Sequence, residues 1–128
     1  MGTATTISVI NDKKALIGGL IMPGVALSLE ALTSKTALLP DIDLEAPKNV
    51  IGKNTVDCIK SGVVLGAAAM IDGTIERIEQ ELGSEATLVA TGGIAGFITP
   101  NCKHDIKIDN NLLLEGLEII YNKNRNEK

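Results

Sequence analysis

The sequence predicts an α/β domain in which strands alternate with helices. Three observations predict it: two apolar segments joined by a polar turn near the amino terminus, one long segment with an apolar stripe in the middle, and short apolar segments that alternate with helical ones after it. The chain has 128 residues, 45% of them apolar, so it is long enough for one domain with a core and too short for two. Only 2% are aromatic, and an aliphatic core is therefore expected.

The first predicted elements are a β-hairpin and a helix. Residues 5–10 are β-branched and apolar, residues 11–14 are typical of a turn, and residues 15–22 form a second apolar run. Pro23 follows at what would be the first helical position, where a proline removes no intrahelical hydrogen bond. We expect a helix over residues 24–34.

A long loop is predicted next. Residues 35–53 contain two prolines and alternating acids, which favours a surface loop with one short extended piece around residues 42–44. Nineteen residues exceed what most connections in a compact domain need, which indicates a functional loop.

The longest predicted element is a helix that Asn54 or Thr55 caps and that runs to about Leu82. A broad apolar stripe lies along it, and the glycine that follows ends it. Gly62 and Gly66 lie one turn apart and expose backbone to a close neighbour, so this helix is the candidate for a subunit contact.

Short strands and helices alternate after the long helix. Residues 86–91 predict a buried strand, and two glycines then lead into a helical segment over residues 94–98 that stops at Pro100. Residues 104–109 predict another short strand. Because strands that alternate with helices tend to be parallel, we expect these later strands to run parallel.

A final helix is predicted over residues 111–122, with Asp109 or Asn110 as its cap and a solvated tail behind it. Its buried side is expected to consist of Leu112, Leu113, Leu114, Leu117, Ile119 and Ile120.

Charge and composition narrow the classes of partner. The net charge is −4 and the basic residues are scattered except at the very end, so no nucleic-acid partner is expected. Neither a secretion signal nor a long uninterrupted apolar span is evident, so we expect a cytoplasmic protein without membrane contact.

The cysteines and the one histidine do not suggest a metal site. Cys58 and Cys102 lack CxxC spacing, and His104 is the only histidine, so buried or half-buried free thiols in a reducing cytosol are favoured over a disulfide or a metal site. We expect His104 to be an ordinary surface histidine.

Four short motifs could carry chemistry, and each has a purely structural alternative. GTATT at residues 2–6 offers backbone N–H groups and hydroxyls to phosphate oxygens, although it is equally a disordered amino terminus. TGG at residues 91–93 and GGLIMPG at residues 18–24 are either ligand-binding turns or plain tight turns. GKNT at residues 52–55 is either a helix cap or a hydrogen-bonding position for a polar substrate.

Taken in order, GTATT, GGLIMPG, LEALTSKTALLP, GKNT, SGVVLGAA and LVATGGIAG resemble the carboxyl-terminal half of type III pantothenate kinases. The resemblance covers essentially the whole chain, and the ordered set is more specific than any single motif. It implies that residues 1–128 are the carboxyl-terminal domain of a two-domain kinase of the actin-like ATPase group. The implied fold is ribonuclease-H-like, a mixed sheet with flanking helices whose first central strand is missing.

The resemblance also implies an activity and its ligands. Such kinases phosphorylate pantothenate to 4′-phosphopantothenate with ATP, the first step of coenzyme A biosynthesis. The implied cofactors besides ATP are Mg²⁺ and a monovalent cation, potassium or ammonium, and the enzymes are typically homodimers.

Five residues match positions that bind ligands in that family. Gly2 and Thr3 match the turn that contacts the ATP phosphates, and Gly92 and Gly93 match the turn on the adenosine side. Thr55 matches the threonine that contacts pantothenate.

The family's metal-binding aspartate would lie directly before Met1, and its catalytic base belongs to the amino-terminal half, so no catalytic or metal-binding residue is expected here. We therefore expect the amino-terminal half of the same enzyme as a partner and little or no activity of this chain alone. The alternative is a non-catalytic binding or regulatory module, similar to transcriptional accessory factors, that keeps the fold.

Overall fold

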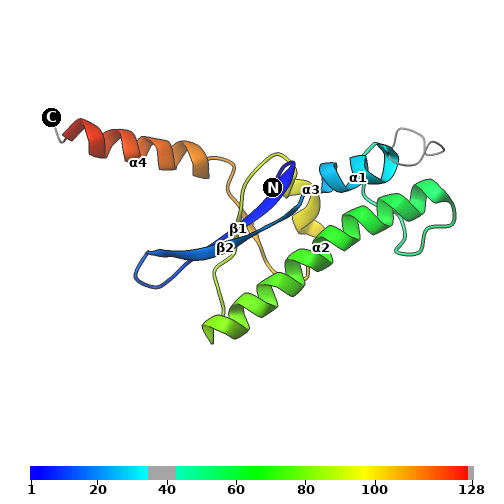
Figure 1. The fold of residues 1–128 in the computed structure, drawn as a ribbon, viewed down its shortest axis with the longest axis horizontal. Helices are drawn as coiled ribbons and strands as arrows, with labels where there is room; N and C mark the ends of the chain where they lie inside the picture. The colour runs from blue at the N-terminus through cyan, green and yellow to red at the C-terminus, as the bar shows by residue number, and fades with distance from the viewer. Residues whose placement is uncertain (35–42, 127–128) are drawn as a thin grey trace.

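The computed structural model describes residues 1–34 and 43–126. Two strands are followed by two helices, and short strands and helices then alternate to the carboxyl terminus (Figure 1). The elements are β1 (Ala4–Ile10), β2 (Leu16–Pro23), α1 (Val25–Ser34), α2 (Thr55–Leu82), β3 (Val89–Ala90), α3 (Ala95–Ile98), the 3₁₀ helix η1 (Thr99–Asn101), β4 (Lys107–Ile108) and α4 (Leu112–Asn126). This order confirms the predicted sequence of elements. The extended piece expected around residues 42–44 falls partly outside the described residues, and residues 43–44 are in neither strand nor helix.

The predicted hairpin is confirmed. β1 and β2 are antiparallel, with Ile7 opposite Leu20, and the Asn11 side-chain oxygen accepts hydrogen bonds from the Lys13 and Ala15 amides across the turn. Asparagine is suited to such turns because its short amide reaches its own backbone.

Pro23 was predicted to be the first helical residue. In the structure it is the last residue of β2. It lies opposite Ala4, so the strand pairing persists through it. A proline is tolerated there because it lacks only a donor at the end of a strand. The Gly24 carbonyl then accepts the first helical bond, from Ser28 N at 2.9 Å, and α1 begins at Val25.

The 28-residue helix α2 begins and ends as predicted. Asn54 is its cap: the Asn54 side-chain oxygen accepts from the Asp57 amide at 2.9 Å, and the Asn54 side-chain nitrogen donates to the Asp57 carboxylate at 2.7 Å. At the other end Gly83 adopts the left-handed conformation, with φ 70°, and donates to the Glu79 carbonyl. Glycine is favoured there because it has no Cβ to clash.

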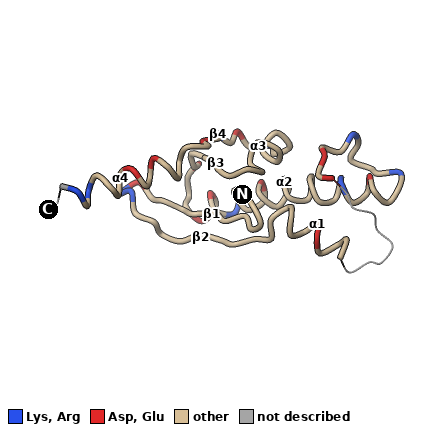
Figure 2. Tube along the Cα trace, turned by 90° about the horizontal axis from the view of Figure 1, so that it is seen from above, with Lys and Arg blue, Asp and Glu red and all other residues tan. Residues whose placement is uncertain are grey.

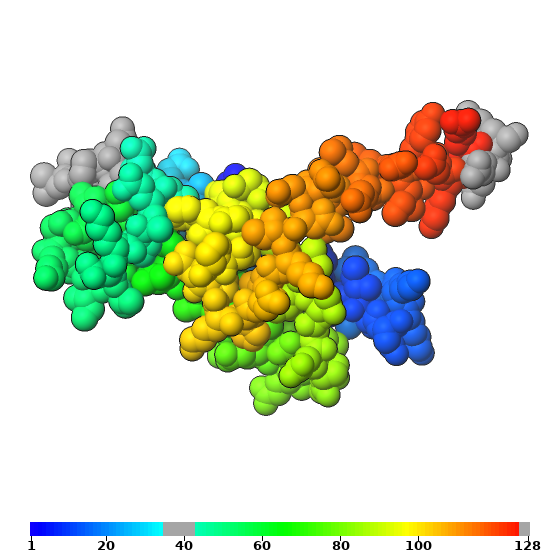
Figure 3. Space-filling model, turned by 180° about the vertical axis from the view of Figure 1, so that it is seen from behind, coloured from blue at the N-terminus to red at the C-terminus, as the bar shows by residue number. Residues whose placement is uncertain are grey.

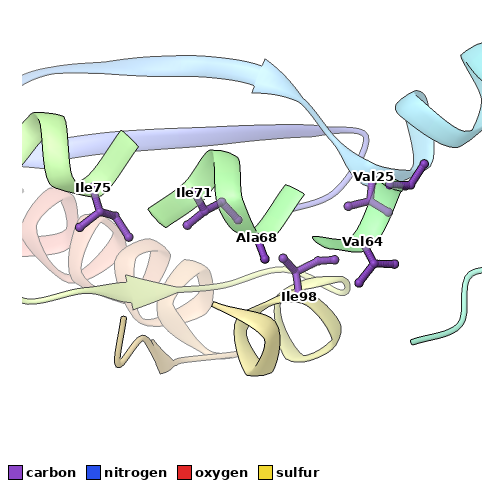
Figure 4. Close-up of a cluster of buried hydrophobic side chains, with 7 residues drawn as sticks. Val25, Val64, Ala68, Ile71, Ile75 and Ile98 are labelled. Atoms are coloured by element: carbon purple, nitrogen blue, oxygen red, sulfur yellow. The ribbon is translucent and has the colours of Figure 1, made fainter. Parts of the chain in front are cut away.

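The core lies along one side of α2 (Figure 4). Val64 of α2 and Ile98 of α3 are fully buried, and Val25 joins them from α1. Burying each such side chain contributes roughly 1.5–3 kcal/mol. The core is aliphatic, as predicted; its buried apolar residues are Val25, Val63, Val64, Ala68, Ile71, Ile75 and Ile98.

The described residues form two separate two-stranded sheets, and the mixed sheet that was predicted lacked its first central strand. β1 pairs with β2, and β3 pairs with β4 in parallel, which confirms the predicted direction of the later strands. Each of these two strands was predicted to span six residues, but only two residues of each are paired. The paired residues are Val89–Ala90 and Lys107–Ile108. The fold is therefore a small mixed α/β domain, and the ribonuclease-H-like assignment remains a prediction.

The helix after the TGG turn ends at Ile98, as predicted, but a 3₁₀ turn that includes Pro100 continues it. Ala95–Ile98 forms α3, and Pro100 lies within the first turn of η1, which follows directly. Proline fits the first turn of a helix because the amide that it lacks would have no partner there.

The final helix, α4, is longer than predicted and its expected buried side is exposed. Asp109 accepts a hydrogen bond from the Asn111 amide, and the Asn111 carbonyl accepts the first helical bond. α4 projects from the body of the molecule (Figure 1). The exposed residues include Leu112, Leu113, Leu114, Leu117, Ile119, Ile120 and Tyr121.

Candidate functional site

Three of the turns that the sequence singled out meet at one place. The Gly24 amide donates to the Thr3 carbonyl at 2.9 Å, which joins the turn after β2 to the GTATT segment. The Met1 amino group donates to the Thr91 carbonyl at 2.7 Å, which joins the same segment to the TGG turn after β3. We call this meeting point, formed by residues 1–3, Gly24 and residues 91–93, the turn cluster.

The glycines of the turn cluster fall into two groups. Gly24 and Gly92 are packed against backbone: a Cβ on Gly24 would overlap the Gly2 and Thr3 carbonyls, and a Cβ on Gly92 would overlap Met1. Gly92 also has φ 105°, a conformation that other residues rarely adopt. Gly2 and Gly93 have open space where a Cβ would lie. These two glycines therefore leave room for the close approach of a ligand, and the Gly2 amide donates to the Ala4 carbonyl at 3.1 Å. Gly24 and Gly92 are explained by packing.

The hydroxyls of the GTATT segment differ in exposure. Thr3 and Thr6 are exposed, whereas Thr5 is only 6% exposed. Thr5 and Thr6 lie on opposite faces of β1 because strand side chains alternate, whereas Thr3 precedes β1 and is not part of this alternation. Of the threonines in this segment, Thr3 is the exposed one that belongs to the turn cluster.

Thr55 lies apart from the turn cluster. It is exposed at the first position of α2, and Figure 1 shows this end of α2 at one end of the molecule, whereas the amino terminus lies near the middle. The structure therefore brings four of the five predicted ligand-binding residues, Gly2, Thr3, Gly92 and Gly93, into one neighbourhood and leaves Thr55 outside it.

A polar cavity of about 360 Å³ lies beside the start of α2. Lys60 in its wall forms a 2.7 Å ion pair with Glu45, and this hydrogen bond holds the pKa of Glu45 below its usual value. Thr55 is not among the lining residues. Figure 2 shows Lys and Arg near this end of the molecule and at the end of α4. The cavity was not predicted from the sequence because its charged residues come from two separate segments, the long loop and α2. These charged lining residues are Glu45, Lys48, Lys53, Asp57 and Lys60.

An apolar groove of about 420 Å³ runs between α1 and α2, and Gly62 and Gly66 lie in it. Within the described residues, nothing lies within 4 Å of where a Cβ on either glycine would be. The close neighbour predicted for these glycines is therefore not found in this part of the chain, and their role in a subunit contact remains a prediction.

His104 is not the simple surface residue that was predicted. His104 Nδ1 lies 2.7 Å from Asp72 Oδ1, and the Lys103 and His104 amides also donate to the Asp72 carboxylate. Burial raises the pKa of Asp72, but these three hydrogen bonds outweigh burial and leave the pKa below its usual value. Asp72 occupies the buried side of α2, and a charged residue in an apolar stripe is a sequence signal that a partner is required.

The cysteines are free, as predicted. Cys58 is exposed, contrary to the prediction, whereas burial and the nearby Asp72 charge raise the pKa of Cys102 to about 11. No group of three His, Cys, Asp or Glu side chains suited to a metal ion occurs among residues 1–34 and 43–126. α2 is long and apolar enough to cross a membrane, but its buried residues face the core, so it is read as a core helix.

Together these features define a small α/β domain with a cluster of glycine turns, and the comparisons place it in a family. The sequence model of the type III pantothenate kinase family matches residues 1–77 of this chain. A type III pantothenate kinase from Moorella thermoacetica is 42% identical over 123 residues, which cover 96% of this chain and 48% of that protein. One from Desulforapulum autotrophicum is 45% identical over 120 residues, which cover 93% of this chain and 46% of that protein.

The chain belongs to the type III pantothenate kinase family and spans about half the length of the relatives that it matches. A solved structure agrees in fold: a Campylobacter jejuni protein assigned to the Baf family of transcriptional activators superimposes with a TM-score of 0.65 at 25% identity, covering 97% of this chain and 55% of that one.

Proposed function

We propose that this chain is the carboxyl-terminal half of an ATP-dependent pantothenate kinase, which phosphorylates pantothenate to 4′-phosphopantothenate. The observation that carries the proposal is the turn cluster, in which residues 1–3 pack directly against Gly24 and Gly92. Membership of the pantothenate kinase family supports the substrate and the reaction.

In this proposal the turn cluster holds ATP. The Thr3 hydroxyl supplies a donor to the phosphates, and the open space at Gly2 lets them approach closely. The open backbone of Gly93 beside Gly92 receives the adenosine side. Thr55, at the start of α2, contacts pantothenate. Positioning and charge neutralisation provide most of the catalysis in phosphoryl transfer, so contacts of this kind contribute directly to the rate.

The residues of the turn cluster do not fit a metal site. The cluster contains threonine, glycine and methionine but no carboxylate, and Mg²⁺ in kinases is held by carboxylates and phosphates. We therefore assign no step to Mg²⁺, potassium or ammonium within this chain. The ligands of these ions and the catalytic base are proposed to come from the amino-terminal half of the enzyme.

The proposal includes the assembly and its location. The amino-terminal half is the partner, the complete enzyme is a homodimer in the cytoplasm, and each half has a ribonuclease-H-like fold. Neither a nucleic acid nor a membrane is proposed as a partner. The two unjoined sheets support a fold that needs a further strand, because unpaired strand edges carry backbone groups without partners.

The first test compares this chain alone with this chain co-expressed with the half of the Moorella thermoacetica relative that it does not match. Formation of 4′-phosphopantothenate from ATP and pantothenate is followed by mass spectrometry. We expect turnover by the pair and little or none by the chain alone. Robust turnover by the chain alone would refute the need for a second half.

The second test addresses the ligand contacts. Thr3→Val in the active pair should raise the apparent KM for ATP by about tenfold or more. Thr6→Val, at an exposed threonine of β1, is the control and should leave this KM unchanged. Thr55→Val should raise the apparent KM for pantothenate with less effect on that for ATP. Equal effects of the Thr3 and Thr6 substitutions would contradict the role of the turn cluster.

A second candidate function is a non-catalytic regulatory module, for which the likeness to a Baf family protein is the supporting observation. A pair of halves that associates and binds ATP but forms no product would favour this module over the kinase.

A further inference from the structure

The final helix carries an apolar stripe with nothing to pack against among the described residues. At 100° per residue, Leu113, Leu117, Ile120 and Tyr121 fall on one side of α4. Their exposed fractions are 69%, 54%, 57% and 63%. An amphipathic helix of a globular protein normally buries such a stripe, so this side of α4 has the character of a contact surface.

The helix also depends on such a contact for its own stability. α4 has 15 residues, and isolated helices of this length are marginal in water. Gly116, in the middle of α4, lowers the intrinsic helical preference further. Helical stability in proteins comes mostly from packing of the apolar side, which points to a partner for α4.

A second exposed apolar surface lies at the same end of the molecule. The β1–β2 hairpin and α4 both extend toward this end in Figures 1 and 2, and the space-filling view in Figure 3 shows an open hollow between them. The exposed apolar residues of the hairpin are distributed over its two faces, because strand side chains alternate; they are Ile10, Leu16, Ile17, Leu20 and Ile21.

We infer that α4 and the outer part of the β1–β2 hairpin form a docking surface for the half of the pantothenate kinase that this chain does not span. This inference rests on the proposed function, in which the two halves act together. The relatives are about twice as long as the matched segment, so a folded body of similar size is available as the occupant. A single body placed between α4 and the hairpin covers the apolar stripe of α4 and one face of the hairpin. A second copy that paired through α4 alone would leave the hairpin residues exposed.

The test uses the full chain, with a tag, co-expressed with the unmatched half of the Moorella thermoacetica relative. Leu113→Glu and Leu117→Glu each place a charge on the stripe. Asn122→Glu places the same charge on another side of α4 and is the matched control, since Asn122 is exposed. The dissociation constant is measured for each purified chain, and far-UV circular dichroism checks that each variant folds. Because Leu113 and Leu117 are exposed, the variants are expected to fold as the parent chain does.

We expect both leucine variants to bind the unmatched half at least tenfold more weakly than the parent chain, and Asn122→Glu to bind it equally well. Equal binding by all four chains, with pantothenate phosphorylation intact, overturns the docking surface but leaves the proposed function standing. No binding by the parent chain and no turnover of the mixture overturns both. A chain that self-associates without the second half, and that Leu117→Glu makes monomeric, overturns the inference in favour of a second copy on α4.

Discussion

Asp72 is a buried carboxylate that fixes the segment after η1 to the long helix. It accepts hydrogen bonds from the Lys103 amide at 2.8 Å and from the His104 amide at 3.2 Å, in addition to the contact with the imidazole. The side chain therefore connects residues more than thirty positions apart and sets the path of the chain from α3 to β4.

Asp72→Asn should lower the free energy of unfolding by about 1–3 kcal/mol, because the amide nitrogen of asparagine would face a backbone donor in place of an acceptor. Urea unfolding of the chain measures the loss. Asp105→Asn, at an exposed carboxylate on the same segment, is the control and should change stability little.

The same contact predicts a pH dependence. The pKa of Asp72 is lower in the folded chain than the value of about 3.9 in unfolded chains, so its contribution to stability is present above about pH 4 and disappears as the pH falls through the folded pKa. Stability measured between about pH 5 and pH 2 should fall less steeply for Asp72→Asn than for the parent chain. Parallel curves for the two chains would show that Asp72 does not contribute to this dependence.

The two cysteines should differ in reactivity. Cys58 is exposed, whereas the raised pKa of Cys102 keeps it in the unreactive thiol form at neutral pH. Iodoacetamide at pH 7.5 should therefore modify Cys58 first, and Cys102 should react only after unfolding in urea. Peptide mass spectrometry over a time course identifies the site; equal rates in the folded chain would contradict the burial of Cys102.

At the scale of the elements, a glycine inside α2 and the glycine that ends it have opposite expected responses to substitution by alanine. Gly62 lies in the helix interior with open space around it, so Gly62→Ala should raise stability by roughly 0.5–1 kcal/mol. Gly83 ends the helix with φ 70°, so Gly83→Ala should lower stability by roughly 1–2 kcal/mol. Thermal unfolding of the two variants and the parent chain measures both, and a loss of stability in Gly62→Ala would indicate a neighbour at that glycine.

The elements show where sequence reasoning succeeds. The limits of α2 were predicted correctly because an asparagine cap and a terminal glycine act locally, through bonds to Asp57 and Glu79. The hairpin was predicted for the same reason, since its Asn11 turn is held by its own neighbours. Pro23 was misplaced because its position depends on a cross-strand partner, Ala4, that no local pattern reveals.

Elements that depend on distant contacts were predicted less well. The periodicity of α4 correctly indicated a helix, but it also suggested a buried side, and burial requires a partner that is not among the described residues. At the candidate site, the sequence identified GTATT and TGG as separate turns. Their meeting through Met1 and Thr91, and the distance of Thr55 from them, are consequences of the tertiary fold.

The whole molecule has two short sheets that no ladder joins within the described residues, and this arrangement predicts uneven protection of its backbone. β3 and β4 contribute two paired residues each, so their amides should exchange with solvent quickly in the isolated chain. Addition of the unmatched half of a relative should slow exchange in β1 and β3 if that half supplies a strand between them. Hydrogen–deuterium exchange with mass spectrometry measures this; unchanged exchange in β1 and β3 on binding would place the missing strand elsewhere.

The lone tyrosine of the chain makes its last helix visible by spectroscopy. The sequence contains no tryptophan and one tyrosine, Tyr121, a residue of α4 that is 63% exposed. Emission excited near the phenol absorption band therefore comes from a single position, without any label. Binding of a partner that has no tryptophan, and no tyrosine at its contact surface, would change the intensity and the quenching of this one signal. Tyrosine fluorescence therefore reports whether α4 is covered.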